Sequence, residues 1–593
     1  MSWFKNNTVR VPWALRWSVR RLFLAIIVAG VAFSQTKQPA DKDYQLGRAA
    51  MERGDLPDAR AALERAVQAN PSSADAQNML GQVLLRQGDL DRAVERFKLV
   101  VKLRPALAIA HLYLAQALQA KNQIDYAVAE YRRAVELAPT QPDAHRALAG
   151  ALSLQKKTDA AAAEMQTAIR LAPQRAELYD DLGVLLVQQS KIKEAEASFR
   201  KCLKLDLKYE PALLHLGAAL ASESNFSEAT PLLAQAVSLN PEDAIAWYYQ
   251  GVSLEGTGNR EEALRCLIRA GELQPDSILL ETRLGLLSQR MGDTDRAVAA
   301  FTRVVQQNPS DPEAHNNLAL TLLQRGDADR AITEFQQAIK LHPEDSSFQQ
   351  NLGSAYLQKT DFDAAAAEFR GALKLSPDSA SLHYDLALTL KLKDDLPGAI
   401  AEWKEALRLD PKLADAHYSL GVTFWQMGDF PSAAEQLRAA IQFQSDYAEA
   451  YYTLGTVLKQ MDKLPEAADA LRQAIKLQPD FAGAHTTLAA VLRQQGDSTG
   501  AAAEARAGAE ISKEKNSLQA ATFATNSGRR LLTVGDLDGA ISQFRSAINS
   551  APTYAQAHYQ LGLALDQKGQ REEAKQEYEK AGQLDPHLAP RTH

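Results

Sequence analysis

The sequence predicts an all-α solenoid, built from one small helical unit that is copied along the chain. Alanine recurs with a constant step of 34 residues from Ala59 to Ala501, and after a single slip of five residues the series resumes at Ala540 and Ala574. Only Gly or Ala stands twelve residues before each alanine, and proline recurs twelve residues after it. A fixed internal period of this length is typical of repeat architectures, so it determines the fold class.

Each unit is expected to form two short helices. Within residues 448–481, apolar side chains recur at helical spacing before and after a polar turn at 461–463. Pro479 ends the second helix because proline lacks the N–H group that a helix requires. Gly455 and Ala467 are expected where the two helices cross, since larger side chains would separate the backbones. Gly–Asp pairs such as Gly88-Asp89 and Gly292-Asp293 are predicted turns, with Gly at positive φ and Asp capping the next helix.

This pattern resembles the tetratricopeptide repeat (TPR) family, whose unit is a 34-residue helix–turn–helix. The resemblance covers residues 40–588 and gives sixteen repeats. It implies a right-handed superhelical solenoid of tandem antiparallel helix pairs, in which the first helix of each pair lines a concave groove. It also implies that the chain is an interaction module, since this family binds ligands in that groove.

The repeats account for nearly the whole chain. The expected divisions are a leader (1–34), a linker (35–39), repeats 1–14 (40–515), an insertion forming a soft joint (516–520), repeats 15–16 (521–588) and a tail (589–593). No stretch of 50 residues or more remains for a catalytic domain, so the sequence predicts that the protein is not an enzyme and needs no cofactor. Repeat fourteen has Ala505 and Lys513 where other repeats have a large residue and proline, which predicts a softer seam at 505–527.

The leader has the pattern of an export signal. Five basic residues and no acidic residue precede an apolar run of twelve, Leu22–Phe33. A basic region, a short apolar core and a small-residue exit describe a secretory signal peptide, cleaved after Ser34 or after Ala32. The alternative is a retained membrane anchor with Trp3, Trp13 and Trp17 at the interface; Arg20-Arg21 also allows twin-arginine export. In each case the repeats are expected outside the cytoplasm, in the periplasm or secreted, and the membrane is contacted only through residues 1–34.

The charge balance argues against nucleic acid as a partner. Without residues 1–34 the chain carries 61 basic and 73 acidic residues, a net charge of −12. A surface of that sign repels a phosphate backbone.

No metal site is expected. Seven histidines occupy one repeat position, four residues before the Gly/Ala: His111, His145, His315, His383, His417, His485 and His558. Copies on stacked helices lie about 8–10 Å apart, too far to share a zinc ion that needs ligands at about 2.0–2.1 Å. We therefore interpret them as half-buried packing residues. Cys202 and Cys266 are two repeats apart, beyond the reach of a disulfide, and are expected in the core.

The candidate binding residues lie on the predicted groove of repeats eleven to fourteen. Tyrosine recurs three residues before the Gly/Ala, and three consecutive copies are expected to stack as a ladder. Amide and basic side chains follow at the next turns. The set is Tyr384, Tyr418, Tyr452, Trp425, Lys391, Lys459, Arg493, Gln426, Gln460 and Gln494. Such a surface suits an extended peptide. The alternative is that tyrosine here only supports helix packing.

The sequence thus predicts a non-enzymatic protein–protein interaction scaffold of the bacterial envelope or periplasm, which binds an extended protein segment in its groove. The alternative is a polysaccharide assembly or export factor that contacts glycan through the tyrosine ladder. Chaperone-tail binding is disfavoured. The family's cochaperones use Lys at the tyrosine position and Asn four residues later, and no repeat here has either.

Overall fold

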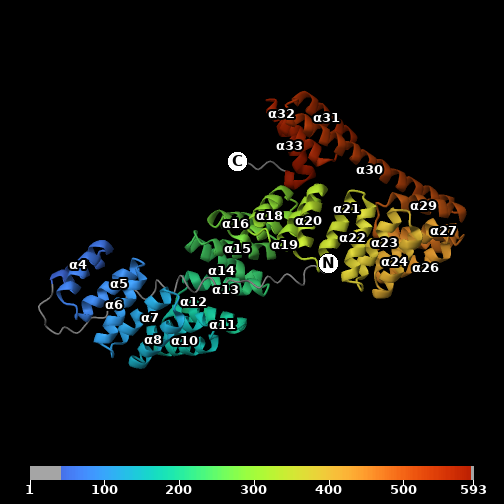
Figure 1. The fold of residues 1–593 in the computed structure, drawn as a ribbon. Coiled ribbons are helices and arrows are strands. Elements are labelled where there is room, and N and C mark those ends of the chain that lie inside the picture. The colour runs from blue at the N-terminus through green and yellow to red at the C-terminus, as the bar shows by residue number, and fades with distance from the viewer. Residues whose placement is uncertain (1–41, 589–593) are drawn as a thin grey trace. The chain divides into compact units, whose positions relative to one another are not determined.

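The computed structural model describes residues 42–588, and within that range the chain is helical with no β-strand. The predicted leader, the linker at 35–39 and the tail lie outside the described residues. The fold class is confirmed: tandem antiparallel helix pairs form an all-α solenoid. Figure 1 shows the succession of helices.

The chain divides into two compact units, at Pro309 and Ser310. This boundary falls between repeats eight and nine, and the sequence analysis did not anticipate it. The helices of the first unit are α3 (Lys42–Glu52), α4 (Leu56–Ala69), α5 (Ala74–Arg86), α6 (Leu90–Leu103), α7 (Ala108–Ala120), α8 (Ile124–Leu137), α9 (Pro142–Leu154), α10 (Thr158–Leu171), α11 (Ala176–Gln188), α12 (Ile192–Leu205), α13 (Glu210–Ser222), α14 (Phe226–Leu239), α15 (Ala244–Gly256), α16 (Arg260–Leu273), α17 (Ile278–Arg290) and α18 (Thr294–Gln307).

The helices of the second unit are α19 (Pro312–Gln324), α20 (Ala328–Leu341), α21 (Ser346–Gln358), α22 (Phe362–Leu375), α23 (Ala380–Leu392), α24 (Leu396–Leu409), α25 (Ala414–Gln426), α26 (Phe430–Phe443), α27 (Ala448–Gln460), α28 (Leu464–Leu477), α29 (Ala482–Gln494), α30 (Ser498–Thr533), α31 (Leu537–Ser550), α32 (Ala555–Gln567) and α33 (Arg571–Leu584), followed by the 3₁₀ turn η2 (Pro586–Leu588). Odd-numbered helices before α30 are first helices of a repeat, and even-numbered ones are second helices.

The small residues at the helix crossing have the role that the sequence predicts. A Cβ atom added to Gly455 on α27 would lie 2.6 Å from Cγ of Leu471 on α28 and 3.1 Å from the carbonyl oxygen of Ala467. Real Cβ atoms do not approach so closely, so the Leu471 side chain or the helix would have to move. Glycine at this position therefore allows the two helices of a pair to lie in close contact.

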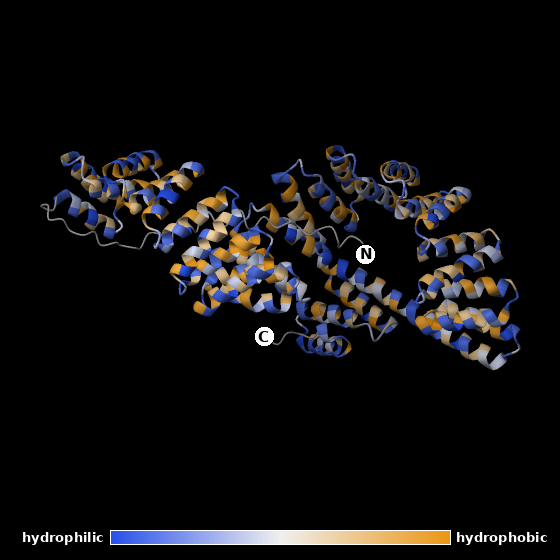
Figure 2. Ribbon diagram, turned by 90° about the horizontal axis from the view of Figure 1, so that it is seen from below, coloured by the Kyte–Doolittle hydropathy of each residue, from blue (hydrophilic) through white to orange (hydrophobic). Residues whose placement is uncertain are grey.

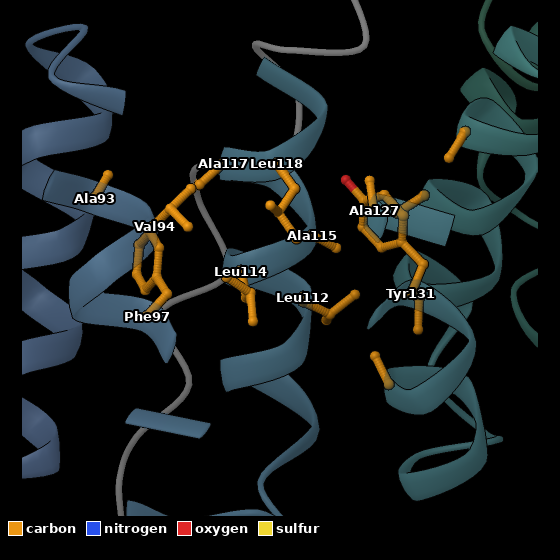
Figure 3. Packing of buried hydrophobic residues seen from close by; sticks show 14 of the residues in the cluster. Ala93, Val94, Phe97, Leu112, Leu114, Ala115, Ala117, Leu118, Ala127 and Tyr131 are labelled. Atoms are coloured by element: carbon orange, nitrogen blue, oxygen red, sulfur yellow. The ribbon is translucent and has the colours of Figure 1, made fainter. Parts of the chain in front are cut away.

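The buried core of each unit extends across successive repeats as several hydrophobic clusters, such as those within residues 50–185 and 176–300 of the first unit. Figure 3 shows Phe97 of α6, Leu114 and Ala115 of α7, and Tyr131 of α8, whose side chains meet between three successive helices. Figure 2 shows that the helices carry hydrophobic and hydrophilic residues together. A single amphipathic pair would leave its apolar stripe in water, so each repeat is stable only against its neighbours.

The predicted Gly–Asp turns are confirmed in backbone conformation. Gly88 and Gly292 have φ of 80° and 78°. The Asp293 carboxylate accepts a hydrogen bond from the Arg296 backbone N–H, as expected for a helix cap. Asp89 differs: its side chain makes no cap hydrogen bond and instead forms an ion pair with Arg60 at 3.6 Å.

The insertion at 516–520 is helical. α30 is one unbroken helix of 36 residues, which joins the second helix of repeat fourteen to the first helix of repeat fifteen. Lys513 replaces the proline that ends most other second helices, and residues 509–520 contain neither Gly nor Pro, so nothing in this stretch interrupts the helix. The expected softness of the seam at 505–527 stays a prediction.

Candidate functional site

All ten candidate residues lie on four consecutive first helices of the second unit, α23, α25, α27 and α29. We call the half-buried side chains of Tyr384, Tyr418 and Tyr452 the tyrosine row. Each belongs to the same position of its repeat, so the helical framework places it in the same orientation relative to its own helix pair.

The tyrosine row is not the direct ladder that the sequence predicts. The Tyr418 ring contacts Tyr447, with centroids 4.9 Å apart, and the Tyr452 ring contacts Phe481 at 4.7 Å. Among the described ring contacts, none joins two members of the row. The reason is spacing: equivalent residues on successive first helices are separated by more than the 4.5–7 Å of an aromatic contact. Tyr447 and Phe481, each at the start of the next first helix, fill the interval.

Polar groups hold the row in place. The Tyr384 hydroxyl lies 3.4 Å from the Ser419 hydroxyl on the next first helix, and Tyr447 donates a hydrogen bond of 3.1 Å to the Asp415 carboxylate. Burial, reinforced by Asp415, raises the pKa of Tyr447 above its ordinary value of 10.0. Burial also raises the pKa of Tyr384. Both hydroxyls therefore remain protonated donors at neutral pH.

The remaining candidates form a second line along the same helices. The Trp425 indole N–H donates a hydrogen bond of 2.7 Å to the Gln460 side chain. The Lys391 ammonium lies 5.9 Å from the centre of the Trp403 ring, and burial lowers its pKa. Gln426 and Gln494 are exposed.

Lys459 and Arg493 are available for an external anion. Neither has an ion-pair partner among residues 42–588. They lie at the C-terminal ends of α27, which carries Tyr452, and of the next first helix, α29. This end of the surface can therefore bind a carboxylate, whereas the tyrosine row offers apolar ring area and hydroxyl donors.

Hydrogen bonds between side chains 35 positions apart connect several pairs of successive first helices between residues 146 and 460. In each pair, a residue on one first helix bonds to the residue that lies one repeat plus one position later, on the next first helix. The described pairs are Arg146–Asp181, Ser153–Gln188, Asp180–His215, Asn316–Asn351, Gln350–Asp385, Tyr384–Ser419 and Trp425–Gln460.

Sequence reasoning missed a charged cluster in the first unit. Arg146 of α9 is 4% exposed, and its Nε lies 2.6 Å from the Asp181 carboxylate on α11. Beside it Asp180 pairs with His215 of α13 at 2.8 Å. Burial raises the pKa of Asp181 against the opposing pull of Arg146. Arg146 and Asp180 occupy the tyrosine position of their repeats, so reading that position through every repeat would have found them.

The histidines pack between helices, and five of the seven are buried where the sequence analysis expected half-buried side chains. In six of the seven repeats Nδ1 lies within 2.6 Å of a glutamate on the second helix of the same repeat: His111, His145, His315, His383, His485 and His558. In His111 the other nitrogen, Nε2, lies 3.1 Å from the Pro105 carbonyl oxygen, which the end of the previous helix leaves without a helical partner. Trp247 donates to the Pro241 carbonyl in the same way. These side chains connect one repeat to the next.

Both cysteines are free and buried, as predicted. Burial raises the pKa of the Cys266 thiol to about 11, so the thiol stays protonated and unreactive. Between residues 42 and 588, no three His, Cys, Asp or Glu side chains converge as a metal ion would require. No helix of this described range is long and apolar enough to span a bilayer.

Comparisons with solved structures return other helical repeat proteins. The chain is similar to Cut9–Hcn1 of the APC/C at 15% identity, covering 76% of this chain and 96% of that one with a TM-score of 0.33. Yeast Tom70 matches at 17% identity, with 81% and 98% covered and a TM-score of 0.34. YrrB, a TPR protein with an unusual peptide-binding site, matches at 27% identity over 32% of this chain and 96% of its own, with a TM-score of 0.27. No curated protein matches the sequence.

Family models match along most of the chain. Models described as tetratricopeptide repeat or TPR repeat match residues 44–108, 84–151, 282–346, 346–379, 390–428, 424–462, 452–514 and 555–588. The model of the cilia and flagella-associated protein 70 middle TPR-like domain matches 147–274. With the helix pairs and their 34-residue period, these matches show that the chain belongs to the tetratricopeptide repeat family, whose repeats serve as scaffolds for protein–protein interaction.

Proposed function

We propose that this protein is a non-enzymatic scaffold of the bacterial envelope or periplasm that binds an extended protein segment along the first helices of repeats eleven to fourteen. The observation that carries the proposal is the tyrosine row with its neighbours. Half-buried rings, exposed glutamine amides and two basic side chains that have no ion-pair partner within residues 42–588 occur together on α23, α25, α27 and α29.

Each part of this surface matches one need of an extended segment. An extended backbone has unpaired N–H and C=O groups, and the exposed amides of Gln426 and Gln494 can both donate to and accept from them. The rings of the row provide apolar area that is already held in place by Tyr447 and Phe481. Pre-ordered rings lose little conformational entropy on binding. Lys459 and Arg493 favour a segment with an acidic residue at that end.

The experiment compares recovery of partners by the exported chain and by a variant with Tyr384, Tyr418 and Tyr452 changed to alanine. We expect a defined protein to copurify with the unaltered chain and to be lost from the triple variant, with the helical circular dichroism retained. The control is Tyr126→Ala, which removes an exposed tyrosine of α8 that lies in the first unit. Equal recovery by the two variants would contradict the proposal, and binding to glycans in place of protein would favour the polysaccharide alternative.

The location outside the cytoplasm follows from the basic, then apolar pattern of residues 1–34. The test is a fusion of residues 1–40 to a reporter that is active only after export. Reporter activity is expected, and it should disappear when the apolar run is interrupted by charged residues. An inactive fusion would contradict the envelope location and would leave the binding proposal to its own test.

A further inference from the structure

The long helix α30 spans the boundary between repeats fourteen and fifteen, where other boundaries have two separate helices. At an ordinary boundary the second helix of one repeat folds back against the first helix of the next, as α28 does against α29 across the four-residue link 478–481. In α30 the equivalents of these two helices, residues 498–511 and 521–533, are joined by nine further helical residues. Because they are parts of one rigid helix, they cannot pack against each other (Figure 1).

The two helix faces that would pack together at this boundary, one on each half of α30, are both exposed to solvent. In the first half of α30, Ala502 and Ala509 are exposed, whereas their equivalents Ala468 and Ile475 on α28 are buried and half-buried. The second half shows the larger difference. Phe523, which stands five residues before the repeat's glycine, is 78% exposed.

The position of Phe523 is otherwise an interior position. Its equivalents in repeats 2–14 and 16 are all at most 3% exposed: Ala76, Ala110, Ala144, Leu178, Ala212, Ala246, Leu280, Ala314, Phe348, Leu382, Ala416, Ala450, Ala484 and Ala557. The first repeat, which has no repeat before it, has the exposed Lys42 at this position. A first helix that remains in water therefore has lysine there in this chain, while the uncovered helix of repeat fifteen has phenylalanine. This contrast indicates that another molecule covers the surface around Phe523 in the functional protein.

A second copy of the chain fits this surface by symmetry. At an ordinary boundary, residues placed symmetrically about the middle of the link face each other, as Thr230 and Ser253 do across the link 240–243, where their hydroxyls lie 2.6 Å apart. By this rule Ala468 falls opposite Val491 and Ile475 opposite Ala484. The same rule applied to α30 gives residue 516, the centre of 512–520, as the midpoint. Two copies of α30 that run antiparallel about a two-fold axis at Asn516 therefore place the first half of each helix against the second half of the other, in the register of an ordinary boundary.

The residues on the axis side of α30 agree with this arrangement. Ala502, Ala509, Asn516, Phe523 and Arg530 are spaced by seven residues and all are exposed. A seven-residue step drifts by only about 20° on a straight helix, so the five lie along one side. Ala509 would face the partner's Phe523, and Asn516 would meet its own copy, where a pair of amides can hydrogen-bond. Ala502 would face the aliphatic stem of the partner's Arg530, whose charged end reaches water at the rim.

We propose that α30 is a dimerisation helix: two copies pair antiparallel through the five-residue row centred on Asn516, and repeats fifteen and sixteen of each copy cover repeat fourteen of the other. The pairing restores at this boundary the contact between second and first helices that the ordinary boundaries within each unit have, such as α26 with α27 and α28 with α29. It needs no rearrangement of α30.

The first test is the mass of the full chain in solution, measured by light scattering. We expect twice the 64.8 kDa of the single chain. Phe523→Asp should shift the mass to that of one chain. The matched control Tyr126→Asp, which changes an aromatic side chain of 70% exposure on α8, should leave the dimer intact. A single-chain mass for the unaltered protein, or a dimer that persists in Phe523→Asp, would overturn the proposal.

A cysteine experiment tests the symmetry itself. Only a residue on the axis meets its own copy, so Asn516→Cys should form a disulfide-linked dimer on mild oxidation. Ala502→Cys alone and Arg530→Cys alone should form no disulfide-linked dimer, whereas a mixture of the two variants should crosslink. The native cysteines do not interfere because both are buried. Failure of Asn516→Cys to crosslink, or equal crosslinking by Ala502→Cys alone, would show that another protein or another surface covers Phe523.

Discussion

The same repeat position carries opposite chemistry in the two units of this protein. In the first unit it holds Arg146 and Asp180, which are buried and pair with Asp181 and His215 of neighbouring repeats. In the second unit it holds the tyrosine row, whose rings are half-buried. Its neighbours Lys459 and Arg493 form no ion pair in the part of the chain that the structure describes. One framework thus uses this position in repeats four and five to connect repeats and in repeats eleven to thirteen to present a surface. Asn316 and Gln350 of the second unit also connect repeats at this position. The period alone does not distinguish the two uses.

The largest expected effect is on stability in the first unit. Arg146→Ala leaves the Asp181 carboxylate, whose side chain is 20% exposed, without its counterion. Breaking a largely buried pair in this way costs about 3 kcal/mol, the lower end of the range for fully buried pairs. The measurement is urea unfolding followed by circular dichroism. Arg133→Ala, which removes an exposed ion pair with Glu136, is the control and should cost less than about 1 kcal/mol. Equal losses in the two variants would mean that the buried cluster does not hold the repeats together.

The second prediction compares two tyrosines at the same repeat position. Tyr248 of α15 is 7% exposed and Tyr418 of α25 is half-buried. Tyr248→Ala should lower the free energy of unfolding by about 3 kcal/mol, because it leaves a cavity in the core, and should leave partner binding unchanged. Tyr418→Ala should lose less stability and weaken binding at least tenfold, which is about 1.4 kcal/mol. The opposite assignment of the two losses would remove the distinction between a packing tyrosine and a binding tyrosine.

The third prediction concerns pH. Burial and Asp415 raise the pKa of Tyr447 above 10.0, so above pH 10 the unfolded chain loses this proton while the folded chain keeps it. The free energy of unfolding therefore falls as pH rises through this range. Tyr447→Phe should show a smaller fall, and Tyr209→Phe should do the same in the first unit, where burial and Asp180 act on the equivalent residue. Parallel curves for Tyr447→Phe and the unaltered chain would contradict the assigned environment.

The smallest expected effect is at the exposed line beside the tyrosine row. Gln460→Ala removes the acceptor of the Trp425 N–H bond, and a single exposed hydrogen bond contributes about 0.5–1.5 kcal/mol at most. We expect a change near the lower end, together with a shift of Trp425 fluorescence. A loss as large as that of Tyr248→Ala would show that Trp425 supports the core and does not serve the surface.

The sequence predicted much of the fold, because the repeat encodes it locally. The 34-residue period, the glycine opposite Leu471 and the histidines beside the proline carbonyls each follow from residues close in the chain. The division at Pro309 was not predicted, because the residues around it keep the repeat pattern. The continuous helix α30 was not predicted, because the repeat pattern does not show whether the helices on the two sides of the insertion join.

The candidate residues lie on successive first helices, as the sequence predicts, and their role in binding stays a prediction. The direct stacking of the tyrosines was wrong. Repeat numbering placed the tyrosines on successive first helices, but their ring partners Tyr447 and Phe481 stand 29 residues later in the chain. Contacts between repeats depend on the angle at which helices stack, and this angle depends on side-chain packing rather than on the period. The Arg146–Asp181 ion pair was not predicted for the same reason, because its two residues belong to different repeats, 35 residues apart.

The most direct measurement of the central claim is site-specific photocrosslinking in the envelope. A photoreactive amino acid at position 418 should give a single protein adduct of defined mass. The same amino acid at position 126, which is more exposed than position 418 and lies on α8 of the first unit, should give none. No adduct at 418, or the same adducts at both positions, would contradict a protein-binding surface at the tyrosine row.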